Sequence, residues 1–109
     1  MILNVFERLL LRNIVPQIQG WNYAYLKEAR ELIEGLFIEQ EEAELHFEQE
    51  GIQVKWQLQR EDGTPIPQER DIPVSDGLKA KIGKYLKQLD KEEKLEFAHM
   101  TLYGKFLGL

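Results

Sequence analysis

The chain has 109 residues, no cysteine and a formal net charge of −5, and 43% of its residues are hydrophobic. This length suits one domain with one core, and the hydrophobic content excludes intrinsic disorder. The absence of cysteine excludes disulfides, thiolate metal sites and cysteine nucleophiles. No apolar run reaches the ~18 residues that a membrane span needs, and the start of the chain lacks a signal-peptide pattern because Glu7 and Arg8 interrupt its apolar residues. We therefore expect a single domain over residues 1–109, located in the cytoplasm and without a membrane partner.

Two helices are predicted in the first third of the chain. Asn4 can cap the first one, and Glu7 three residues later completes a capping box. Pro16 disfavours helical backbone at the residue before it, so this helix should end at about residue 14. Its expected inward-facing residues are Phe6, Leu9, Leu10 and Ile14. A second helix is expected over residues 22–36, with an apolar stripe of Leu26, Ala29, Leu32, Ile33 and Leu36.

The middle of the chain changes from a helical period to a strand period. Residues 38–45 predict a short helix with glutamates near its N-terminus, where the helix dipole favours negative charge. Apolar and polar residues then alternate up to Leu58 around a turn at Glu50-Gly51, which predicts a β-hairpin with one apolar face. The expected apolar residues of this hairpin are Leu45, Phe47, Ile52, Val54, Trp56 and Leu58. The spacing of Ile72 and Val74 predicts a third, short edge strand.

Two further helices are predicted after this strand region. Ser75 can cap a helix over residues 76–89, and Asp90 with Glu93 forms a capping-box pattern for a last helix. The expected inward-facing residues of the last helix are Leu95, His99, Leu102 and Phe106. The prediction is an α+β fold with four to five helices and a small antiparallel β-hairpin or three-stranded sheet between residues 45 and 74.

Catalytic residue types are scarce in this chain. The two histidines, His46 and His99, belong to no recognisable nucleophile or metal-binding motif, and the only serine, Ser75, is explained as a helix cap. The glycines never cluster into a phosphate-binding loop. We expect no cofactor and no metal ion, and a histidine-dependent enzyme is the third of our functional hypotheses.

Nucleic acid is not an expected partner. Three helices followed by a hairpin resemble the order of a winged-helix domain, in which the third helix enters the DNA groove. Here the third helix is glutamate-rich, so phosphates would repel it. Lys84, Lys87 and Lys91 share one face of a later helix, which is the usual pattern of a solvated surface.

The acidic middle of the chain is the most distinctive feature of its sequence. Residues 31–50 contain eight glutamates and neither lysine nor arginine, whereas residues 79–109 contain seven lysines and four acidic residues. Such a segment can attract a basic protein partner, although helix N-terminal charge and a solvated strand face also explain it. The candidate partner-binding residues are Glu39, Glu41, Glu42, Glu44, His46 and Glu48.

Self-association is the alternative to a separate protein partner. Trp21, Tyr23 and Tyr25 cannot all face one core, and an exposed aromatic patch favours a homo-oligomer or a small structural component.

Several short motifs occur in a fixed order from residue 7 to residue 106: ERLLLRNIVP, LKEARELIEGL, EGIQVKW, DIPV, IGKYLKQLDKEEKL and LYGKF. In this order the chain resembles small uncharacterised proteins of tailed-phage and prophage genomes and of bacterial metagenomes. The resemblance implies a non-enzymatic accessory protein of a phage or mobile element, which would act in the host cytoplasm. It implies no catalytic residues.

Overall fold

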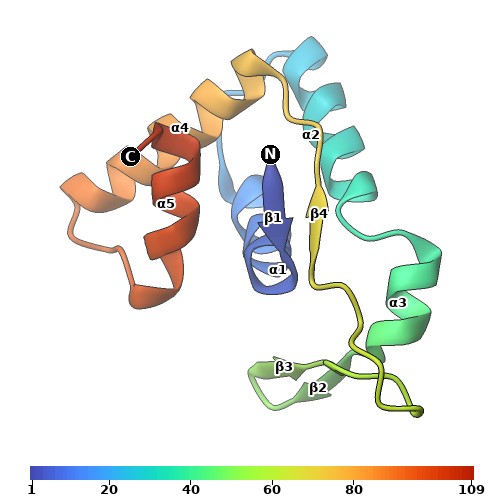
Figure 1. The fold of residues 1–109 in the computed structure, drawn as a ribbon. Helices are drawn as coiled ribbons and strands as arrows, with labels where there is room; N and C mark the ends of the chain where they lie inside the picture. Colours follow the sequence, from blue (N-terminus) through green and yellow to red (C-terminus); the bar gives the residue numbers. More distant parts are fainter.

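The computed structural model describes all 109 residues and has the α+β fold that the sequence predicts. It contains five α-helices, two short 3-10 helices and two separate antiparallel sheets of two strands each (Figure 1). The elements in chain order are β1 (Ile2–Asn4), α1 (Val5–Ile14), η1 (Val15–Gln17), α2 (Tyr23–Gly35), α3 (Glu39–Leu45), β2 (Glu48–Glu50), β3 (Gln53–Lys55), β4 (Glu69–Asp71), α4 (Asp76–Lys91), η2 (Phe97–His99) and α5 (Met100–Leu107). No helix combines the length and the apolar character that crossing a membrane requires.

Helix α1 begins and ends where the sequence predicts. The side chain of Asn4 accepts a hydrogen bond from the Glu7 backbone N–H at 2.8 Å, and the Asn4 backbone N–H donates to Glu7 Oε1 at 2.9 Å. These two bonds form the expected capping box. The helix ends at Ile14, and Pro16 lies in the short η1 turn that follows.

The predicted apolar face of α1 is wrong in part. Phe6 is 44% exposed and Leu10 is only half-buried, whereas Glu7 and Arg8 are completely buried. The reason is the position of α1 in the centre of the molecule, between α4 and α5 on one side and β4 with α3 on the other (Figure 1). A helix that is covered on several sides buries polar residues as well as its apolar stripe, provided that they find partners.

The predicted third strand pairs elsewhere. Strand β4 comprises Glu69–Asp71, just before the expected position, and it pairs with β1 in the register Leu3↔Arg70. It does not extend the hairpin into a three-stranded sheet. Strand β1 was not predicted, because its three residues carry no strand period and its partner lies 67 positions away in the sequence. The pairing places Leu3 and Ile72 in the core.

The hairpin is present but shorter than its alternating pattern indicates. Leu45 ends α3 instead of starting a strand, and Ile52 occupies the turn between β2 and β3, where it is 99% exposed. The turn has two residues, and Gly51 at its first position has a φ of +60°, which a type II′ turn requires and which glycine adopts without strain. Leu58 is also exposed.

Aromatic side chains attach the hairpin to the core. The ring of Phe47 lies edge-on to Phe37, with 5.2 Å between the ring centroids, and Trp56 lies 6.4 Å beyond Phe47. The indole N–H of Trp56 donates to Gln68 Oε1 at 3.0 Å. The strand alternation therefore predicts correctly that Phe47, Val54 and Trp56 pack against the core.

The C-terminal helices also differ in their boundaries. Ser75 caps α4 as expected, with 3.2 Å between its Oγ and the Leu78 backbone nitrogen. Helix α4 continues to Lys91, so Asp90 lies inside it and the predicted Asp90–Glu93 capping box is wrong. Glu93 has a φ of +57° and lies in the reversal between α4 and α5, and His99 belongs to η2 instead of facing the core.

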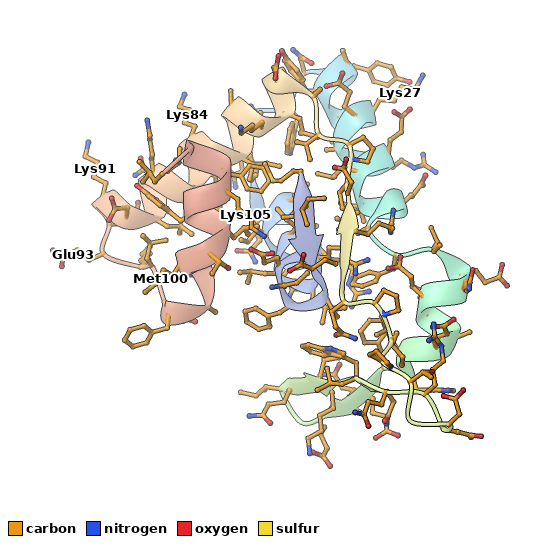
Figure 2. All side chains as sticks on the ribbon, in the orientation of Figure 1. Lys27, Lys84, Lys91, Glu93, Met100 and Lys105 are labelled. Atoms are coloured by element: carbon orange, nitrogen blue, oxygen red, sulfur yellow. The ribbon has the colours of Figure 1, made fainter.

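An ion pair between the buried Glu7 and the half-buried Lys105 holds α5 against α1. Lys105 Nζ donates to Glu7 Oε1 at 2.7 Å and to the Ile2 carbonyl at 2.8 Å. Figure 2 shows Lys105 extending from α5 toward β1 and α1. Glu7 Oε2 is buried without a hydrogen-bond partner, so one carboxylate oxygen carries all the polar contacts of this side chain.

We expect Asn4→Ala to destabilise the chain more than Asn22→Ala, its counterpart at the exposed N-terminus of α2. Loss of a cap costs about 1–2 kcal/mol, and only Asn4 caps a helix whose N-terminal residues are buried. Urea unfolding of the two variants and of the wild type measures the difference. Equal decreases of the unfolding free energy in the two variants would contradict the central position of the α1 N-terminus.

Candidate functional site: the acidic side of α2 and α3

A completely buried arginine lies beneath the acidic segment. Arg8 Nη1 donates to the Leu36 carbonyl at 2.9 Å and to Glu41 Oε2 at 2.7 Å, and Nη2 donates to the Gln68 carbonyl at 3.1 Å. Its guanidinium carbon lies 4.6 Å from the centroid of the Phe37 ring, where a cation is attracted by the aromatic face. The side chain thus has a partner on each side and can stay charged inside the protein.

Glu41 joins this arginine to a second one. Its Oε2 accepts from Arg8, while its Oε1 accepts from Arg70 Nε at 3.0 Å and from the Ile38 backbone N–H at 3.1 Å. Arg70 Nη2 also donates to the carbonyls of Gly35 and Leu36, at 2.7 and 3.0 Å. These carbonyls form the negative end of the α2 dipole, which favours cations at this place.

The pKa of Glu41 follows from these contacts. Burial by itself would raise it, but the hydrogen bond from Arg8, the Ile38 N–H and the charges of Arg8 and Arg70 together hold the pKa below its usual value of 4.5. Both oxygens of Glu41 are therefore engaged within the molecule, and its side chain is only 16% exposed. Among the predicted partner-binding residues, Glu41 serves to connect α3 with α1 and β4.

Three more glutamates of the acidic segment have cationic partners in the structure. Arg60 Nη2 lies 2.9 Å from Glu44 Oε2, Arg30 Nε lies 3.0 Å from Glu34 Oε1, and Lys55 Nζ lies 2.6 Å from Glu50 Oε2. These pairs are exposed and contribute little to stability, but they reduce the negative charge that the segment presents.

Four of the eight glutamates remain exposed and free of any ion pair: Glu31, Glu39, Glu42 and Glu48. Glu31 belongs to α2, and Glu39 and Glu42 belong to α3, the two helices that follow one another along one side of the molecule (Figure 1). We name these three residues the acidic surface. Ile38, which is 47% exposed, lies between the two helices. Glu48 lies apart from them, on the hairpin.

An open depression of about 650 Å³ adjoins the acidic surface between α2, β4 and the start of α4. Glu28, Glu31 and Asp71 line it above an apolar floor that includes Leu32 and Ile72. Glu28 Oε2 accepts from Ser75 Oγ at 3.1 Å, and Asp71 Oδ1 accepts from the Met1 amino group at 2.7 Å. Sequence reasoning missed this depression, because it combines residues from distant parts of the chain.

Neither histidine lines this depression. His46 ends α3 in a left-handed conformation with φ +48°, and it is exposed beside an open polar hollow that also contains Glu44, Arg60 and Asp62. His99 Nδ1 accepts from the Glu96 backbone N–H at 2.9 Å and so helps to cap η2. No three His, Asp or Glu side chains approach one another closely enough to hold a metal ion.

Comparison with known proteins gives no match: no protein-family model, no curated protein and no solved structure is significantly similar to this chain.

We expect Glu41→Gln to be strongly destabilising and Glu42→Gln, one position later on the same helix, to be nearly neutral. Glu41→Gln leaves Arg8 buried without its counter-charge, which costs about 3 kcal/mol, whereas exposed substitutions stay within about 0.5 kcal/mol. Chemical denaturation of both variants tests this contrast. A Glu41→Gln protein as stable as the wild type would show that the buried pair is not required.

Stability should fall in acid because of Glu7 and Glu41. Burial alone would raise the pKa of Glu7, but the Asn4 N–H and Lys105 together hold it below 4.5, as the arginines do for Glu41. Because the folded-state pKa values are the lower ones, the unfolded chain binds more protons than the folded chain in acid. The stabilisation by the two ionised carboxylates is therefore complete well above pH 4.5 and is lost as the pH falls through the folded-state pKa values. Unfolding free energies measured from about pH 7 to about pH 3 test this. A flat profile would contradict it, and Glu41→Gln should reduce the slope.

Proposed function

We propose that this chain is a non-enzymatic protein-binding module that receives a basic segment of a partner protein on its acidic surface. The observation that carries the proposal is that Glu31, Glu39 and Glu42 stay exposed and unpaired, while the buried and neighbouring carboxylates have partners within the chain. These free charges raise the local concentration of a basic partner and orient its approach.

The depression beside the acidic surface suits a lysine or arginine side chain. Such a side chain can lay its aliphatic part on the accessible apolar residues of the lining, Pro73 and Val74, and direct its charged end to carboxylates at the rim. Hydrogen bonds between cationic and carboxylate groups are about twice as strong as neutral ones. Glu28 and Glu31 are the rim carboxylates that no cation occupies.

Most lysines belong to α4 and the residues after it, although Lys27 lies on α2 one turn before Glu31. Lys84 and Lys91 extend outward from α4, on the far side of the ribbon from α3 (Figure 2). Nucleic acid is disfavoured at the acidic surface, because carboxylates repel phosphates. We further propose a role as an accessory protein of a phage or mobile element with a partner in the host cytoplasm, which is what the order of its sequence motifs implies.

Two variants with equal changes in charge test this function. Glu39→Gln with Glu42→Gln neutralises the two glutamates that α3 contributes to the acidic surface, whereas Glu61→Gln with Glu93→Gln removes two exposed carboxylates elsewhere that also lack ion pairs. The immobilised wild-type chain and both variants are incubated with a bacterial lysate, and the captured proteins are identified by mass spectrometry. We expect a lysine- or arginine-rich protein that the first variant loses and the second retains.

Salt provides the second measurement on the captured partner. Capture should weaken steadily as ionic strength rises, because exposed charges are screened beyond about 8–10 Å at physiological salt. Equal capture by both variants, or capture that does not depend on salt, would refute the acidic surface as the binding site.

A further inference from the structure

An apolar groove of about 540 Å³ lies on the side of α2 that faces away from the acidic depression. Six of the residues that line it are Val15, Pro16, Ile18, Trp21, Leu26 and Ile33. Leu26 is 51% exposed, and Tyr23 at the edge of the groove is 83% exposed. Leu26 and Ile33 are the two positions of the predicted α2 stripe that the core does not bury. The groove is therefore apolar surface that the monomer leaves uncovered.

Lys27 and Arg30 line the rim of this groove together with one carboxylate, that of Glu34. Lys27 has no ion-pair partner and extends outward from α2 (Figure 2), and Arg30, which pairs with Glu34, lies one turn further along the helix. Lys81 Nζ is held 5.0 Å from the centroid of the Trp21 ring and donates to the Gly20 carbonyl at 2.6 Å. An apolar floor with a cationic rim fits a protruding apolar side chain that has carboxylates beside it.

The chain itself carries such an element at the tip of its hairpin. Ile52 is 99% exposed at the second position of the two-residue turn, so the turn geometry holds its side chain outside the fold. Glu48 has no ion pair, and Glu50 at the start of the turn pairs only with the exposed Lys55. Phe97 is the other apolar side chain that is more than nine-tenths exposed, and glutamates flank it as well, but it belongs to η2 and lies beside Leu95, Met100 and Tyr103 instead of at the tip of a hairpin.

We propose that the hairpin tip of one copy of this chain docks into the α2 groove of a second copy. Ile52 covers Trp21 and Leu26, and the glutamates of the hairpin approach Lys27 on the rim. The two halves of this contact lie on different surfaces of each molecule. Two copies form a closed dimer if each tip enters the groove of the other copy. If each tip enters the groove of a different copy, the molecules form an open chain. This contact is independent of the proposed function, because it leaves the acidic surface uncovered.

Sedimentation velocity over a wide range of protein concentrations tests the contact. The wild type should associate as its concentration rises, and Ile52→Asp should raise the dissociation constant at least about tenfold, because it removes a buried apolar side chain and adds a charge. Tyr23→Ser with Lys27→Glu should weaken association on the groove side by a similar factor. Phe97→Ser, which removes an equally exposed apolar side chain elsewhere, should leave association unchanged.

Mixing the two defective variants gives the most specific result. Ile52→Asp retains an intact groove, and the Tyr23→Ser, Lys27→Glu variant retains an intact tip, so the mixture should recover a heterodimer that neither variant forms alone. A wild type that remains monomeric throughout, association that depends on Phe97 instead of Ile52, or a mixture that does not recover association would overturn the proposal. Far-UV circular dichroism of each variant shows that it is folded, because all four substituted positions are exposed.

Discussion

The carboxylate of Glu41, held between Arg8 and Arg70, is the interaction on which the rest of the structure depends. It brings together α1, the end of α2, the start of α3 and strand β4. Removing Glu41 leaves the completely buried Arg8 without its counter-charge, which is far more costly than the loss of a surface pair. The position of α3, and through α3 that of the hairpin, follows from this contact.

Helix α1 contains two buried charged residues, and each of them is paired with an opposite charge from another helix. Glu7 and Arg8 are neighbours in the sequence and both are completely buried, but Glu7 binds Lys105 of α5 while Arg8 binds Glu41 of α3. Two consecutive charged residues of one central helix therefore anchor the two halves of the molecule. Each is compensated by an opposite charge and by backbone groups, which makes burial of both possible. The glutamates of the acidic surface, by contrast, form no ion pair within the molecule.

Local patterns in the sequence predicted the helices well. The caps at Asn4 and Ser75 and the hairpin turn at Gly51 depend on residues a few positions apart, so they were readable from the sequence. The β1–β4 pairing and the Arg8–Glu41 contact were not, because their partners lie 67 and 33 positions apart and neither leaves a periodic signal. Glu41 could not be distinguished from Glu39 and Glu42 by its sequence neighbours. Only the arrangement of α3 against α1 separates the structural glutamate from the free ones.

A double-mutant cycle between Glu41 and Arg70 tests this account most directly, with Glu42 and Arg70 as the reference pair. Unfolding free energies are measured for the wild type, Glu41→Gln, Arg70→Gln and the double variant, and for the corresponding set with Glu42→Gln. We predict a coupling energy of about 1 kcal/mol or more for Glu41 with Arg70, and none beyond about 0.3–0.5 kcal/mol for Glu42 with Arg70. Additive effects at Glu41 and Arg70 would contradict the central role of this carboxylate.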